Sequence, residues 1–220
     1  MKKNRISVNA VRHAICIVVA LLLVSSALVG AVYAKYTSRK QMNLSLSVEA
    51  YGEIHLSLCE GANAGAQWAS STHALRVAPG ATQTFNPYVA VGANSESCYL
   101  FVKVAEAGGN VTANATEYTF SDFITYAVAD GWTRGDGVNI PDNVYYRTVE
   151  KNVSDQFFGV IADDRITCPD SITSELLGVL TAEKYPSLTI TAYAVQKTNL
   201  TDPDRDNTTA EGAWAWIMAN

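Results

Sequence analysis

Histidine, and with it the residue clusters on which many enzymes depend, is scarce in this chain. Only three histidines occur among 220 residues, and the two beyond the N-terminal segment, His55 and His73, stand in separate segments. Neither belongs to a His-Glu-x-x-His pair, which places two zinc ligands and a general base on one face of a helix. A Gly-x-Ser-x-Gly elbow, a phosphate-binding glycine loop and a dinucleotide-binding fingerprint are also missing. These absences predict a protein that is not an enzyme and needs no cofactor.

Positive charge is scarce as well once the first 34 residues are set aside. That segment holds four basic residues and no acidic one. Removing these four from the 16 Lys and Arg of the whole chain leaves 12 basic residues against 21 acidic ones, a net charge of −9. Nucleic acids and anionic membrane surfaces attract a positive protein face. The remaining chain is therefore predicted to bind neither nucleic acid nor an anionic membrane surface.

The N-terminal segment has the pattern of an export signal. A basic stretch precedes residues 14–34, which carry no charged side chain and are long enough to span a bilayer as a helix. Val32, Tyr33 and Ala34 then precede Lys35, and the small residue Ala34 predicts cleavage directly after it. The alternative is an uncleaved signal anchor. Both alternatives place everything beyond Ala34 outside the cell, secreted or at its surface, with membrane contact only through the signal segment.

The cysteines leave two alternatives open. Cys16 lies in the signal segment, so Cys59, Cys98 and Cys168 remain, an odd number for an exported chain. One alternative is a disulfide between Cys59 and Cys98 with Cys168 left over. The other is three buried reduced thiols that pack as small apolar side chains.

The rest of the chain alternates apolar and polar residues as strands do. In residues 43–51, for example, Leu and Val alternate with Ser and Glu, the period of two that a half-buried strand needs. Pro-Gly, Gly-Gly and Asp-Gly turns separate such runs and favour an antiparallel β-sandwich over alternating strands and helices. The predicted strands are residues 43–51, 98–107 and 187–196, and less regularly 74–78, 82–91, 122–129, 143–150 and 157–161.

Two short helices complete the predicted organisation. Residues 171–182 carry Ile and Leu at helical spacing, and Thr208 with Glu211 forms a capping-box pattern ahead of an apolar C-terminal run. No linker or repeat indicates a second folded domain. The predicted domains are a signal peptide at 1–34, a tether or donor segment at 35–42 and a mainly β sandwich at 43–220.

One acidic stretch has part of a calcium-binding pattern. Asp202, Asp204 and Asp206 stand at alternate positions, as the carboxylates of a calcium loop do. However, Asn207 stands where such a loop needs glycine, and Ala213 stands where it needs a bidentate Glu. The favoured interpretation is a solvated acidic turn, which leaves these three residues as a weak calcium candidate and predicts no metal site elsewhere.

Several motifs in a fixed order resemble one family of exported proteins. The stretch LVGAVYAKYTS, from Leu28 to Ser38, is similar to the export signal of the TasA/camelysin family of Gram-positive bacteria. Residues 75–104, 129–149 and 188–217 resemble, in order, a strand–Pro-Gly–strand unit, a Gly-Trp and paired-Tyr hairpin, and a terminal strand and helix of that family. Each motif is weak alone, and their shared order carries the resemblance.

The resemblance implies an architecture and a role. It implies a jelly-roll-like sandwich, processing by a SipW-type signal peptidase, and an exported, non-enzymatic biofilm-matrix or surface fibre subunit that self-associates. In fibre-forming members the mature N-terminal segment pairs as a strand with the next subunit, and the matching positions here are about 35–50. The predicted assembly strand has an apolar face made of Leu44, Leu46, Val48 and Ala50.

Three alternatives to this expectation stay open. The same strand can pair within its own chain because its alternation suits either arrangement. The protein can also be a monomeric, membrane-anchored surface binding module. More distantly, it can be a secreted metal-dependent peptidase, since some relatives have been described as metallopeptidases.

Overall fold

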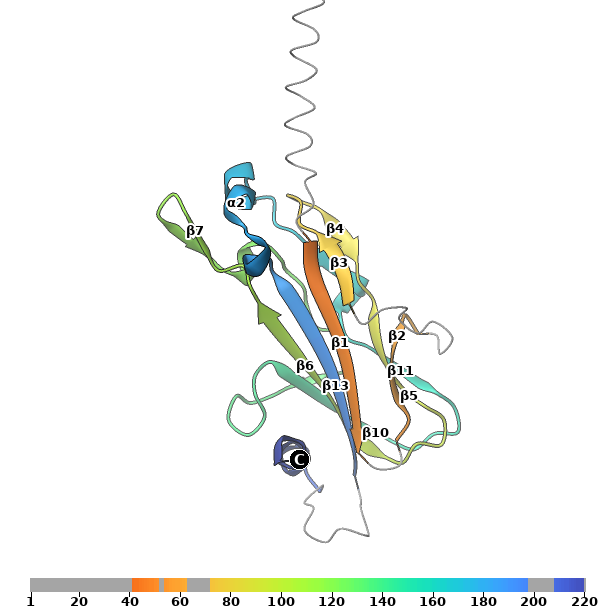
Figure 1. Cartoon of the computed structure of the whole chain (residues 1–220). Helices are drawn as coiled ribbons and strands as arrows, with labels where there is room; N and C mark the ends of the chain where they lie inside the picture. The colour runs from red at the N-terminus through yellow and green to blue at the C-terminus, as the bar shows by residue number, and fades with distance from the viewer. Residues whose placement is uncertain (1–40, 52–53, 63–71, 198–207, 220) are drawn as a thin grey trace, which may run out of the picture. The chain divides into compact units, whose positions relative to one another are not determined.

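Three long strands form the centre of the main sheet in the computed structural model (Figure 1). They are β1 (Gln41–Tyr51), β6 (Cys98–Ala107) and β13 (Ser187–Gln196). The last two have the predicted bounds, and β1 begins two residues before the predicted start, so the predicted tether overlaps it. The structure describes residues 41–51, 54–62, 72–197 and 208–219, within a compact unit that spans Lys40–Asn220.

The main sheet has six strands in the order β3-β1-β13-β6-β10-β9. Every described pair in it is antiparallel except β1 and β13, which run parallel. The prediction of antiparallel pairing therefore holds with this one exception. The three remaining strands are β3 (Thr72–Arg76), β9 (Thr133–Arg134) and β10 (Val144–Val149).

Smaller sheets form the second layer and complete a mainly β sandwich, as the alternation predicted. One has the order β11-β5-β2 and another pairs β12 with β4. Val89 and Val91 of β5 belong to the same buried core as Leu100 and Ile190 of the main sheet, so the two layers share one apolar interior. These strands are β2 (Leu56–Glu60), β4 (Thr82–Thr84), β5 (Pro87–Val91), β11 (Gln156–Gly159) and β12 (Arg165–Thr167).

Helix α3 (Ala210–Ala219) covers part of the outer face of the main sheet. Its Trp214 lies with its ring centroid 5.3 Å from that of Phe101 and 5.6 Å from that of Tyr193. Aromatic pairs at such distances add about 0.5–1.5 kcal/mol beyond the burial of their area. The helix begins at Ala210, and the Thr209 hydroxyl accepts the Gly212 N–H at 3.0 Å, one residue beyond the predicted cap residue Thr208. In the described ranges, none of the helices has the length and apolar character that a membrane span requires.

Segment 122–129 is not the strand that its composition predicted. It begins in the 3-10 helix η1 (Phe120–Asp122) and then forms only isolated bridges at Thr125 and Val128. Asp122 accepts the backbone N–H of Thr119 at 2.7 Å, which fixes a helical turn where the strand was expected. Phe123 and Ile124 are both buried, and two consecutive buried residues do not follow the alternation of a surface strand.

The other helices are short. Helix α2 (Ser174–Val179) is half as long as the predicted 171–182, because Thr173 caps it by accepting the Leu176 N–H at 3.2 Å. Two further 3-10 helices are η2 (Ala162–Asp164) and η3 (Ala182–Lys184).

None of the three cysteines in the described ranges forms a disulfide, and all three are fully buried, which agrees with the second alternative above. The pKa of the Cys98 thiol is raised to about 12, mainly by burial and to a smaller extent by the negative charge of Glu150. A protonated, buried thiol is a poor nucleophile, so Cys98 acts as a core side chain.

A tight hairpin joins β7 (Val111–Ala113) to β8 (Thr116–Tyr118). Its two turn residues, Asn114 and Ala115, have φ of 50° and 62°. Two positive φ values are typical of the hairpin turn that prefers Asn followed by Gly. Ala115 is therefore strained by its Cβ.

Ala115→Gly is expected to stabilise the protein. Removing the Cβ relieves the strain of the left-handed conformation, while glycine loses more conformational entropy on folding than alanine does. The net gain in the free energy of unfolding is expected to be about 0.5–1 kcal/mol. Denaturant unfolding measures this change. The matched control is Ala105→Gly in β6, where glycine should instead cost about 0.5–1 kcal/mol. Equal destabilisation by both substitutions would contradict the assigned turn.

Candidate functional site

The predicted assembly strand lies within the main sheet of its own chain. Strand β1 pairs in parallel with β13 over nine positions, from Asn43 opposite Ser187 to Tyr51 opposite Val195. On its other edge it pairs antiparallel with β3, from Gln41 opposite Arg76. In this single chain the strand therefore makes the intrachain pairing, one of the two alternatives considered.

The side chains of β1 fit the predicted apolar face only in part. Leu46 is buried opposite Ile190, as predicted, whereas Ala50 is exposed although its partner Ala194 is buried. On the outer face the Ser47 hydroxyl donates to the Thr191 hydroxyl at 2.9 Å. Leu44 and Val48 lie opposite Leu188 and Ala192, and their side chains are outside the description. Among the described side chains of β1, Leu46 alone is buried, and the strand has pairing partners on both of its edges.

Several predicted residues fall outside the described ranges. They are Val32, Tyr33, Ala34 and Lys35 at the cleavage site, and Asp202, Asp204 and Asp206 of the calcium candidate.

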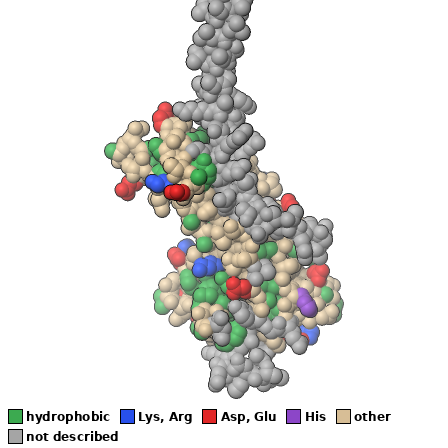
Figure 2. All heavy atoms as spheres, viewed as in Figure 1, with side chains coloured by type: hydrophobic (Ala, Val, Ile, Leu, Met, Phe, Trp, Pro, Cys, Tyr) green, Lys and Arg blue, Asp and Glu red, His purple; other side chains and the backbone are tan. Residues whose placement is uncertain are grey.

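The described ranges hold no cluster of metal ligands. In the residues that the structure describes, no three His, Cys, Asp or Glu side chains gather where they could hold a metal ion. His55 is exposed, and His73 lies in β3. On the face in Figure 2 the coloured Lys and Arg side chains are few and stand apart from one another.

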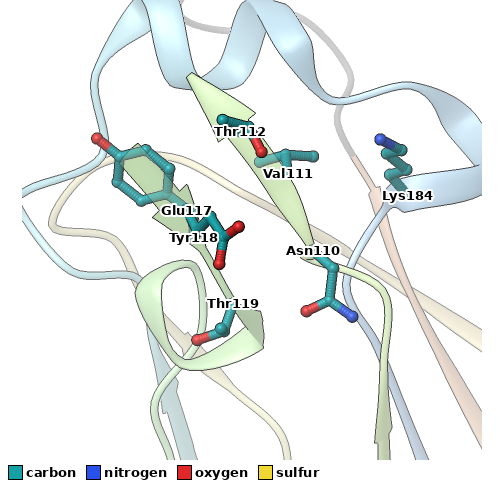
Figure 3. Close-up of a pocket in the computed structure, with 7 residues that line it drawn as sticks. All are labelled: Asn110, Val111, Thr112, Glu117, Tyr118, Thr119 and Lys184. Carbon is teal, nitrogen blue, oxygen red and sulfur yellow. The ribbon is translucent and has the colours of Figure 1, made fainter. Parts of the chain in front are cut away.

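One pocket, the hairpin pocket, is lined by residues of β7 and β8 together with Asn110, Thr119 and Lys184, and has a volume of about 310 Å³. Thr112 and Glu117 are register partners and therefore lie on one face, while Val111 on the opposite face is buried. Figure 3 shows Lys184 beside this hairpin and the ring of Tyr118 on the side away from it. The pocket carries one acidic and one basic side chain.

A second pocket, the tyrosine pocket, is larger, at about 460 Å³. The pairing of Tyr145 with both Val102 and Arg134 shows that Arg134 and Tyr145 lie on the inner face of the main sheet. By strand alternation Val104 and Glu106 lie on the same face. The lining residues are Val104, Glu106, Tyr126, Arg134, Asp142, Asn143 and Tyr145.

Hydrogen bonds hold the polar groups of the tyrosine pocket in place. The Tyr126 hydroxyl donates to Glu106 Oε1 at 2.6 Å. Burial and this bond raise the pKa of Tyr126 above its ordinary value, so the phenol keeps its proton. Arg134 donates from Nε to the Asp142 carbonyl at 2.7 Å and from Nη2 to Asp142 Oδ2 at 3.3 Å. No sequence motif marks this pocket, because Tyr126 and Glu106 come from separate segments.

In β10, the strand that also carries Tyr145, the guanidinium of Arg147 lies over two aromatic rings. Its guanidinium carbon lies 4.1 Å from the Phe158 ring centroid and 5.5 Å from that of Trp132. The Trp132 indole donates to the Gly159 carbonyl at 2.8 Å, which fixes its ring. Burial lowers the pKa of Arg147, and its Nε has no hydrogen-bond partner in the described part of the chain. The cation–π stack joins β10 to the second layer.

The loop between β9 and β10 is organised by one carboxylate. Asp136 Oδ1 accepts the backbone N–H groups of Val138 and Asn139 at 2.9 Å and of Ile140 at 3.1 Å. These bonds lower the pKa of Asp136, and the bond from the Ile140 N–H has the largest effect. The loop leads directly to Asp142 and Asn143 of the tyrosine pocket.

Asp136→Ala is expected to lower the Tm at neutral pH, because three backbone donors lose their shared acceptor. Since the folded pKa is lowered, the stabilisation is complete above the ordinary Asp pKa and is lost as pH falls through the folded value. The Tm difference from the unaltered protein should therefore shrink in acid, as thermal melts at several pH values can measure. Asp136→Asn, which keeps one acceptor oxygen, should lose less, and Asp130→Ala is the exposed control. A pH-independent difference would contradict the assignment.

No protein-family model, curated protein or solved structure matches this chain, so the resemblance to the TasA/camelysin family stays a prediction from its motifs.

Proposed function

We propose that this protein is an exported, non-enzymatic subunit of an extracellular matrix or surface fibre that assembles by exchanging β1 between copies. The observation that carries the proposal is the position of β1. It is the first strand of the described unit, yet it lies between β13 and β3 in the main sheet. Without β1, the edges of β13 and β3 face a gap that the β1 strand of another copy can fill.

The contacts of β1 suit such an exchange. Strand addition gains its affinity from main-chain hydrogen bonds and its register from side chains at alternate positions. Here the parallel ladder with β13 supplies the hydrogen bonds, and Leu46 opposite Ile190 marks the register. A strand from a second copy makes the same contacts, so the exchange replaces each contact with an identical one.

The connection from β1 to the next strand is short. Strand β1 ends at Tyr51 and β2 begins at Leu56, so only residues 52–55 join them. Short hinges of this kind promote domain swapping. A subunit that donates its β1 to one neighbour and accepts β1 from another makes a head-to-tail contact, which extends into a filament when it does not close into a ring.

A monomeric surface binding module is the second candidate function. The tyrosine pocket favours it, because its polar groups converge on one cavity next to aromatic rings. An uncleaved signal segment would then tether the module to the membrane.

A cysteine pair across β1 and β13 is expected to distinguish exchange from self-pairing. The hydroxyls of Ser47 and Thr191 are 2.9 Å apart, so Ser47→Cys with Thr191→Cys should form a disulfide when oxidised. Under exchange, oxidised fibres should run as covalent ladders on a non-reducing gel. The three native cysteines are buried and should not interfere.

The matched control pairs two strands that exchange leaves together. The hydroxyls of Thr82 in β4 and Thr167 in β12 are 3.3 Å apart, and their cysteine pair should bridge within one chain in every preparation. Exchange would be refuted if samples in which electron microscopy shows fibres contain only intrachain bridges between positions 47 and 191. Strictly monomeric particles at all concentrations would refute fibre assembly.

The secreted protein is expected to begin at Lys35. Cleavage after Ala34 removes the apolar segment and frees the chain that leads into β1. N-terminal sequencing of protein recovered from the culture medium and from the cell surface measures this directly. An intact Met1 in both fractions would instead support the anchored binding module.

A further inference from the structure

We infer that the tyrosine pocket binds a saccharide and prefers an amino sugar to an anionic one. The inference depends on the geometry of this pocket and does not depend on the assembly of β1. Its volume, about 460 Å³, falls within the range of small-ligand sites, about 300–1,000 Å³.

Two tyrosine rings give the pocket apolar surfaces that are already in position. Tyr126 packs edge-on against Phe120, with ring centroids 6.4 Å apart, and Tyr145 packs against the main core. The hydroxyl of Tyr126 is tied to Glu106, so its ring cannot turn freely. A ring held in this way loses little entropy when the C–H face of a sugar packs against it.

The polar groups match the hydrogen-bonding capacity of sugar hydroxyls. A hydroxyl both donates and accepts, so it needs acceptors and donors side by side. Glu106 and Asp142 offer acceptors, and Asn143 offers both an acceptor and donors. Arg134 donates two of its N–H groups to Asp142. The side chains of Arg134 and Asp142 are 62 % and 70 % exposed, so a ligand can reach them from solvent.

The charges of the pocket select among sugars. The Arg134 guanidinium is paired with Asp142, and the Glu106 carboxylate accepts from the neutral Tyr126 hydroxyl, so no ion pair in the described part of the chain neutralises Glu106. An ammonium group on the ligand can pair with Glu106, while a carboxylate or phosphate would face it with like charge. An amino sugar therefore fits better than a neutral sugar, and an anionic sugar fits worst.

The test is an NMR titration of the full-length, isotope-labelled chain in a detergent without a sugar headgroup. The probes are glucosamine, glucose and glucuronate. The expected result is saturable shifts at the amides of Tyr126, Asn143 and Tyr145, with affinity falling in the order of these probes. Glu106→Gln keeps the shape of the side chain and removes its charge, so it should weaken glucosamine binding about tenfold and change glucose binding much less.

Glu117→Gln in the hairpin pocket is the matched control and should change neither affinity. Circular dichroism establishes that both variants fold. The inference is overturned if no sugar saturates the shifts, if glucuronate binds as tightly as glucosamine, or if Glu117→Gln weakens binding as much as Glu106→Gln does. Fibre formation by the same samples is a separate readout, so loss of sugar binding and loss of assembly are distinguishable.

Discussion

The pairing of β13 on both of its edges is the interaction on which the rest of the structure depends. Ten register pairs join it to β6 and nine join it to β1, so its main-chain groups meet partners on either side. Its inner side chains, among them Leu188 and Ile190, are fully buried in the shared core. On the outer face Tyr193 and Val195 belong to the smaller core under α3. The strand is thus the point at which the main sheet, the second layer and the C-terminal helix are joined.

The parallel neighbour of β13 connects this architecture to the proposed assembly. Strand β1 completes the sheet next to the β3 edge, whereas the tyrosine pocket involves β6, β9 and β10 toward the opposite edge. In the proposed fibre, exchange of β1 repeats the same contacts between copies and leaves the pocket residues unchanged. Assembly and saccharide binding would then use separate parts of one sheet, and a fibre would present the pocket once per subunit.

Sequence patterns were most reliable where one strand face is buried along its full length. Strand β13 has the predicted bounds, and its buried residues alternate along nearly all of its length, whereas β6 also has the predicted bounds with its first five residues all buried. Segment 122–129 has strand-like composition, yet Asp122 caps a turn that redirects the chain. Strands β2, β7, β8, β9 and β12 were not predicted, because two to five residues are too few to show a period. The tyrosine pocket has no local signature, since its residues come from four separate segments.

The sequence by itself determined which long segments form strands, which of their faces are apolar, and that known catalytic motifs are missing. These properties depend on residues close together in the chain, where alternation and composition can be read directly. Only the tertiary structure decided that β1 runs parallel to β13, that three cysteines stay apart in the core, and that Tyr126 meets Glu106. Such contacts join segments distant in sequence, and their selection depends on how the two layers pack as a whole.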